Sequence, residues 1–134
     1  MEEALTALLL GHAPLTALVG QRVHWLRQPA GVAAFPYVNL QIAGGDRSYH
    51  MKGETGLRKT RVQADVWGEN YTSSKAVMRA FEDVLSGYSG AILGVKIQGA
   101  FMEQPRDLTD ETTGAERQLF RLTVDTEISW HLET

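Results

Sequence analysis

The stretch from Leu57 to Leu85 constrains the fold most, because its hydrophobic period changes once along its length. Apolar and polar residues alternate from Lys59 to Trp67, with Val62, Ala64 and Val66 on one side. Alternation with a period of two is typical of a strand that is buried on one face. We therefore expect a half-buried strand in the first half of this stretch.

The second half of the stretch has a helical period instead. Its apolar residues recur at spacings of three and four and form one stripe on a helix. They are Ala76, Val77, Ala80, Phe81, Val84 and Leu85. Thr72 or Ser73 can cap the start of this helix, and Gly87 lies just past its end. A strand that leads directly into an amphipathic helix predicts a helical layer packed on a sheet.

Other segments supply the remaining elements. The predicted strands are Val23–Leu26, Tyr37–Ala43, Val95–Met102 and Gln118–His131, and the predicted short helices are Glu2–Leu10 and Leu15–Val19. A chain of 134 residues is expected to form one domain. The predicted fold is a single α+β domain over residues 1–134. Its sheet of about four or five strands is antiparallel, with a mixed sheet as the alternative, and two main helices pack on one face.

The segment from Gly44 to Gly56 contains four glycines and mixed charges. It is either a mobile loop or two strand ends that extend as a hairpin, because loops of about twelve residues are uncommon inside a compact domain. Glycine raises the backbone entropy that ordering must overcome. We expect this segment to be mobile in an isolated subunit. Its order, and the extension of its flanking strands, would then require a partner.

Basic residues gather around this segment, with Tyr49 and His50 between them. They are Arg47, Lys52, Arg58, Lys59 and Arg61. One interpretation is a surface that faces phosphate groups or an acidic partner. The other, which is favoured over direct DNA binding, is a solvated loop and strand end. The formal net charge of −3 also argues against gripping nucleic acid as the main task of the chain.

The sequence contains no recognisable motif for catalysis or metal binding. Its four histidines are scattered without metal-ligand spacing, and cysteine is absent, which fits a reducing compartment. The longest early apolar run, Leu8–Leu10, is too short for a membrane span or a signal peptide. We expect a protein without cofactor, metal ion or membrane contact that is kept in the cytosol until it joins a partner.

The aromatic residues of the strands divide into two groups. Trp130 and Phe120 fall on the apolar phase of the last strand, so we expect both in the core. Trp67 falls on the polar phase of its own strand. Tryptophan is enriched at protein interfaces, so Trp67 is the better candidate for an interface.

The order of these features resembles a known family. An N-terminal helix is followed by LTALVGQRV and by the strand FPYVNLQIAGG. Next come YHMKGETGLRKTRVQADVWGENYTSSKAV, GVKIQGAFMEQPRDLTDETTG and a long final strand. From Ala4 to Trp130 the chain resembles the phage tail-completion family, the tail-terminator or head–tail joining proteins of long-tailed phages, prophages and gene transfer agents. The most specific parts are the strand and helix with Val62, Asp65, Trp67 and Tyr71, and the run Arg106–Gly114.

The resemblance implies a structural subunit that assembles as a ring, typically a hexamer. Such a ring caps the finished tail tube and docks to the head connector, and DNA passes through its lumen without sequence-specific binding. The implied partners are further copies of the chain, the major tail-tube protein and a head-completion or connector protein. The implied location is the head-proximal end of the virion tail, after assembly in the cytoplasm of the bacterial host.

We expect the oligomer or lumen contacts around the glycine-rich segment. The candidate residues are Arg47, Tyr49, His50, Met51, Lys52, Arg58, Lys59 and Trp67. Two alternatives stay open. The first is a head-closure, connector or tail-tube subunit of the same particle. The second is a small hydrolase that uses His50 with Asp46, which requires a pocket where these residues converge.

Overall fold

The computed structural model describes the backbone of residues 1–26, 35–50, 53–107 and 120–132, and their side chains except those of 48–50 and 53–55. The helices are α1 (Glu2–Leu10), α2 (Ala13–Val19) and α3 (Tyr71–Leu85). The strands are β1 (Val23–Trp25), β2 (Tyr37–His50), β3 (Gly53–Gly68), β4 (Gly90–Ile92), β5 (Val95–Met102), β6 (Arg106–Asp107) and β7 (Phe120–Leu132). No helix within these ranges is long and apolar enough to cross a membrane.

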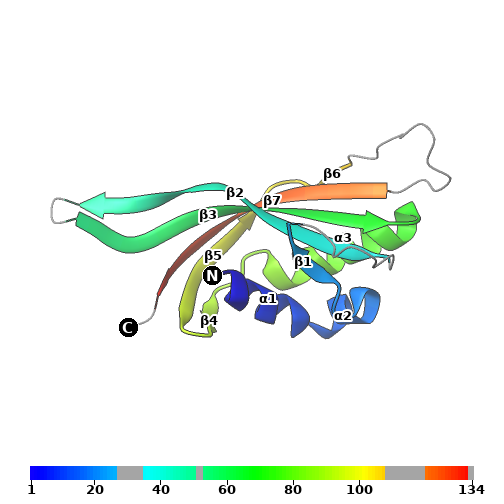
Figure 1. Cartoon of the computed structure of the whole chain (residues 1–134), viewed down its shortest axis with the longest axis horizontal. Coiled ribbons are helices and arrows are strands. Elements are labelled where there is room, and N and C mark those ends of the chain that lie inside the picture. The colour runs from blue at the N-terminus through cyan, green and yellow to red at the C-terminus, as the bar shows by residue number, and fades with distance from the viewer. Residues whose placement is uncertain (27–34, 51–52, 108–119, 133–134) are drawn as a thin grey trace.

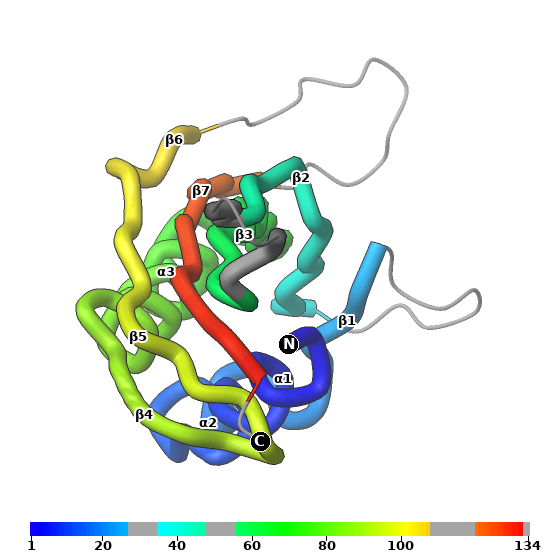
Figure 2. The backbone as a smooth tube through the Cα atoms, turned by 90° about the vertical axis from the view of Figure 1, so that its left-hand side faces the viewer, coloured from blue at the N-terminus to red at the C-terminus, as the bar shows by residue number. Residues whose placement is uncertain are grey.

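The strands form one mixed sheet in the order β1-β2-β3-β7-β5-β4, with β6 paired to β7 (Figure 1). The strand β1 runs parallel to β2, whereas the other pairs are antiparallel. Figure 2 shows the sheet curving over the helices. The prediction of four or five strands and two helices was wrong, because the described ranges contain seven strands and three helices. The missed strands β4 and β6 have three and two residues, too few for alternation to be visible.

Helix α3 lies where the periodicity places it, but a different residue caps its start. The side chain of Asn70 accepts a hydrogen bond from the backbone N–H of Ser73 at 2.7 Å. Thr72 and Ser73, the predicted caps, lie inside the first turn. Asn70 satisfies a backbone donor that has no partner within the helix, which is the reason that asparagine is favoured at this position.

The core lies between the helices and the covered face of the sheet. Helix α3 contributes Phe81 and sheet strands contribute Leu40 and Ile128, all of them buried. Trp130 is 7% exposed and belongs to this core, as predicted. Phe120 is only half-buried, so its assignment to the core was wrong.

The position of Phe120 explains this difference. It pairs with Gly68 at the last position of the β3–β7 ladder, where the sheet ends. Its ring meets the ring of Tyr71 edge to face, with 6.4 Å between the centroids. The apolar phase of a strand indicates which face a residue is on, but it does not indicate how far the core extends along that face.

Strands β2 and β3 continue as a hairpin arm, which we define as residues Gln41–Arg61 and of which the base, Arg58–Arg61, still pairs with β7. Strand β1 pairs with β2 only as far as Leu40, and β7 pairs with β3 only from Arg58 onward. Figure 1 shows the arm projecting from the body. The pairs run on from Gly44 opposite Arg61 to His50 opposite Gly53.

The hairpin alternative for the glycine-rich segment is therefore the one that forms. The expectation that the flanking strands extend only when a partner holds them was wrong, because they pair in the single chain. Long pairing of β3 with β7, over eleven residue pairs, anchors the base of the arm. Met51 and Lys52 lie outside the described residues.

Candidate functional site

The arm carries balanced charges on the sheet face that the helices do not cover. Asp46 lies directly opposite Lys59, and Arg61 lies directly opposite Glu127 of β7. Residues that face each other across antiparallel strands project to the same side of the sheet. These four side chains and Gly45 line an open hollow of about 220 Å³. Each base thus has an acid on the neighbouring strand, and this face of the arm is not a uniformly positive surface.

The predicted basic cluster is divided between the two faces of the arm. Arg47 lies opposite Arg58, on the face that also carries Trp130. The guanidinium carbon of Arg58 lies 5.4 Å from the ring centroid of Trp130. Arg58 is therefore a half-buried part of the base of the arm, whereas Lys59 and Arg47 are exposed. Successive residues of a strand point to opposite faces, so neighbours in the sequence do not form one patch.

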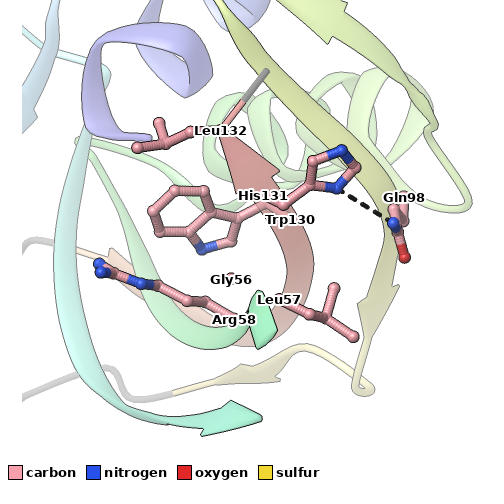
Figure 3. A pocket seen from close by; sticks show the side chains of 7 residues that line it. All are labelled: Gly56, Leu57, Arg58, Gln98, Trp130, His131 and Leu132. Carbon is pink, nitrogen blue, oxygen red and sulfur yellow. Dashed lines mark hydrogen bonds between the residues drawn. The ribbon is translucent and has the colours of Figure 1, made fainter. Parts of the chain in front are cut away.

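A larger hollow of about 550 Å³ lies where β7 ends and the arm continues alone (Figure 3). Apolar side chains of Leu57, Trp130 and Leu132 form much of its wall. A hydrogen bond of 3.1 Å between Gln98 and Nδ1 of His131 lies on one side. The lining residues in the described part of the chain include no carboxylate. This geometry suits contact with an apolar group of a partner better than acid–base chemistry.

Trp67, the predicted interface residue, already has partners within its own subunit. Its ring stacks on Tyr37, with 6.5 Å between the centroids and 17° between the planes. The guanidinium carbon of Arg121 lies 5.3 Å from the Trp67 centroid. Arg121 also forms an ion pair of 3.1 Å with Asp65, which is 5% exposed. A contact of Trp67 with another subunit stays a prediction.

The same cluster changes the acidity of Tyr37. Burial raises the pKa of its hydroxyl above 10.0, and the negative charge of Asp65 raises this pKa further. Both effects disfavour the tyrosinate form. Tyr37 is therefore neutral at physiological pH, and its ring serves as a packing partner for Trp67.

The structure adds residues that the sequence did not single out. Arg121 and Tyr37 complete the Trp67 cluster, and Asp125 forms an ion pair of 3.7 Å on the same face with Arg106, the first residue of the Arg106–Gly114 run. Alternation places Arg121 and Asp125 on the polar phase of β7, but only the strand register shows which residues they meet. Within the described ranges no group of three or more histidine, aspartate or glutamate side chains is arranged to hold a metal ion.

For half of the predicted contact residues the structure describes no side chain. Tyr49 and His50 have described backbone in β2 but no described side chain, and Met51 and Lys52 lie outside the described residues altogether. Asp46, the proposed hydrolase partner of His50, faces Lys59 across the arm. The predicted His50–Asp46 pair therefore lies outside the described side chains.

Comparison with known proteins places the chain in a structural context. The sequence model of the family described as tail completion protein gp17 matches residues 3–129. A search of curated proteins finds no match. A solved chain from the virion of a native gene transfer agent particle is 19% identical, with a TM-score of 0.76 over 98% of this chain and 94% of that one. A second solved chain, whose name states no function, is 14% identical, with a TM-score of 0.54 over 100% of this chain and 96% of that one. At these identities the two structures are evidence of a shared fold.

Proposed function

We propose that this chain, which belongs to the tail completion protein gp17 family, forms a ring that caps the tail tube and joins the tail to the head. The match over residues 3–129 confirms the family resemblance and makes the chain a structural protein of a virion tail. The ring, its lumen and the joining role go beyond that match. The family match is the observation that carries the proposal, and the two faces of the sheet support it.

The two faces of the sheet differ in a way that suits a ring around DNA. Helices cover one face and bury the core, while the other face carries the polar side chains of β3 and β7. We assign the uncovered polar face to the lumen. Lys59 and Arg61 would then meet DNA, and Asp46 and Glu127 opposite them would limit the attraction. Weak, salt-sensitive phosphate contacts let DNA slide, because each strong contact would have to be broken during passage.

The arm supplies the contacts in this proposal. It extends past the body, and an isolated two-stranded hairpin is marginally stable in water. Contact with a neighbouring subunit or with the tail tube would stabilise it. Lys59 would face the lumen, and Arg47 and Arg58, on the other face, would approach a subunit contact. Tyr49, His50, Met51, Lys52 and Trp67 keep their proposed role as oligomer or lumen contacts.

Electron microscopy of purified tails tests the proposal. A chain with a peptide tag at its C-terminus would be located with a gold-labelled antibody on tails and on complete particles. We expect one label position at the head-proximal end of the tail, and tails without heads when the chain is absent. Label along the tube would support a tail-tube subunit, and label on tail-free heads would support a head-closure protein. Either result would contradict the tail-terminator role.

Negative-stain images of the purified chain test the ring itself. We expect closed rings with a central hole, in which the number of subunits can be counted. The resemblance implies a hexamer, so a clear sixfold average is the expected result. Open filaments would show head-to-tail contacts that do not close, and they would contradict the ring.

A further inference from the structure

The pairing of β3 with β7 ends before either strand ends, and the two strands then separate. Their last pair is Arg58 opposite Trp130. Beyond it β3 continues beside β2 in the arm, and β7 continues beside β5 to Leu132 opposite Val95. The hollow of about 550 Å³ lies between the separating strands, because Gly56 of β3 and Leu132 of β7 both line it (Figure 3). We call this place the fork, and no strand of the described chain lies between β3 and β7 there.

Side chains line the fork from both faces of the sheet, since successive residues of a strand point to opposite faces. Figure 3 shows two groups, each with apolar and polar members. On one side lie Trp130, Leu132 and Arg58, and on the other lie Leu57, His131 and Gln98. The alternating side chains of an added strand would meet these two groups in turn. The fork therefore suits an extended segment, and Leu132, which is 60% exposed, offers it apolar surface.

The charge at the fork is positive, in contrast to the balanced face of the arm. The described lining residues include Arg58 and no carboxylate. Arg47 lies directly opposite Arg58 on the other strand of the arm, so two positive charges project to the same side. Like charges in this position repel each other, and a carboxylate from a partner would reduce the repulsion. On the polar face, by contrast, Lys59 has Asp46 opposite.

We propose that the fork receives an extended, acidic segment of another virion protein as an additional strand. Peptides that add to a sheet bind through main-chain hydrogen bonds, and their alternate side chains provide specificity. One apolar side chain would pack beside Leu132, the next residue of the segment would face Leu57, and a carboxylate would approach Arg58. A nucleic acid has neither a strand edge nor carboxylates, so a protein fits better. This contact is separate from the proposed ring and does not depend on it.

Photocrosslinking in intact virions tests the occupant of the fork. Gln98 is exposed and lines the fork, so Gln98→p-benzoylphenylalanine places a photoreactive group there. Leu93→p-benzoylphenylalanine is the control, because Leu93 is 70% exposed and lies outside the lining residues. We expect the Gln98 variant, and not the control, to become attached to an acidic segment of another virion protein, identified by mass spectrometry. Attachment to a second copy of this chain or to DNA, or no product, would overturn the inference.

Charge variants at Leu132 test the acidic character of the segment. Leu132→Glu and Leu132→Lys both replace an exposed side chain, so the melting temperature should change little in either. With the photoreactive group at position 98, Leu132→Glu should lower the yield of the product at least about tenfold through repulsion of the carboxylates, and Leu132→Lys much less. Exclusion of the chain from virions counts as complete loss of the product. Equal losses in the two variants would overturn the acidic segment.

Disulfide trapping tests the extended conformation, because the chain contains no cysteine of its own. Leu132→Cys would be combined with single cysteines at successive positions of the crosslinked segment. A disulfide forms only when the Cα atoms lie within about 7 Å and the Cβ atoms point toward each other. We expect bonds at every second position, which is the period of a strand. A period of three or four would show a helix and would overturn the added strand.

Discussion

The indole Nε1 of Trp130 donates a hydrogen bond to the hydroxyl of Thr60 at 2.9 Å. In the β3–β7 ladder Thr60 pairs with Ile128, and Trp130 pairs with Arg58. The bond therefore links side chains from two different residue pairs and joins β7 to β3 at the base of the arm. The guanidinium group of Arg58 lies over the same indole ring. Trp130 therefore fixes the base of the arm through its packing, one hydrogen bond and one cation–π contact.

Trp130→Ala should lower the free energy of unfolding by about 3–5 kcal/mol, because the ring is 7% exposed and leaves a cavity. Trp130→Phe keeps most of the packing and removes the N–H donor, so its cost should be about 1 kcal/mol. Urea unfolding followed by circular dichroism measures both. A near-neutral Trp130→Ala in this assay would place the ring outside the core.

Phe120→Ala should cost much less than Trp130→Ala. Phe120 is half-buried at the end of the ladder, and its main aromatic partner is Tyr71. We expect a loss of about 1–2 kcal/mol, since an edge-to-face pair adds about 0.5–1.5 kcal/mol to a modest burial. Tyr71→Ala is the matched variant, and the double variant should cost less than the sum of the two. Strict additivity would contradict the contact.

Sequence periodicity predicted the long elements and the short strand β1, and it missed the short strands β4 and β6 for a physical reason. Helix α3 and strands β5 and β7 bury one face over eight residues or more, so their pattern is visible in the sequence. Strands β4 and β6 owe their existence to pairing with β5 and β7, and such distant contacts leave no local pattern. The long strands were predicted correctly, whereas the predicted number of strands was wrong.

The candidate site was predictable in composition but not in arrangement. The sequence shows bases near the arm, but the register shift between Ile42 and Gly44 decides which face each one occupies. A shift of one residue moves every following side chain to the other face. This irregularity brings Asp46 opposite Lys59 and separates Lys59 from Arg47. No pattern in the sequence alone marks its position.

The raised pKa of Tyr37 predicts a loss of stability at high pH. Its folded-state pKa lies above 10.0, so the folded state holds the phenol proton more tightly than the unfolded state. The stabilising contribution is present below pH 10 and is lost as the pH rises through the folded-state pKa. Ultraviolet titration should show one tyrosine with a midpoint above 10, and Asp65→Asn should move this midpoint down. An unchanged midpoint in Asp65→Asn would contradict the influence of the Asp65 charge.

Gly45→Ala should disrupt the arm and spare the body of the subunit. A β-carbon at Gly45 would overlap the backbone carbonyl oxygen of Lys59 on the opposite strand, and backbone cannot move aside as a flexible side chain can. We expect faster amide hydrogen exchange along the arm with little change in the exchange of α3. Gly44→Ala is the matched control, because Gly44 also has a positive φ, of 141°, but a β-carbon there meets nothing within 4 Å, so the exchange along the arm should be faster in Gly45→Ala than in Gly44→Ala. An equal effect of the two variants would show that backbone conformation, rather than the clash, limits this position.

Exchanging the charges of Asp46 and Lys59 separates local pairing from contact with a partner. Lys59→Glu places two acids opposite each other and should lower the free energy of unfolding by less than about 1 kcal/mol, because both residues are exposed. It should also reduce the number of tails joined to heads, because the polar face becomes acidic. The double variant Asp46→Lys with Lys59→Glu restores the opposite pair and the charge of that face, so both the stability and the count of joined particles in electron micrographs should recover. A double variant that recovers stability but not joined particles would show that Lys59 makes a specific contact with a partner, and the balanced face would not explain its role.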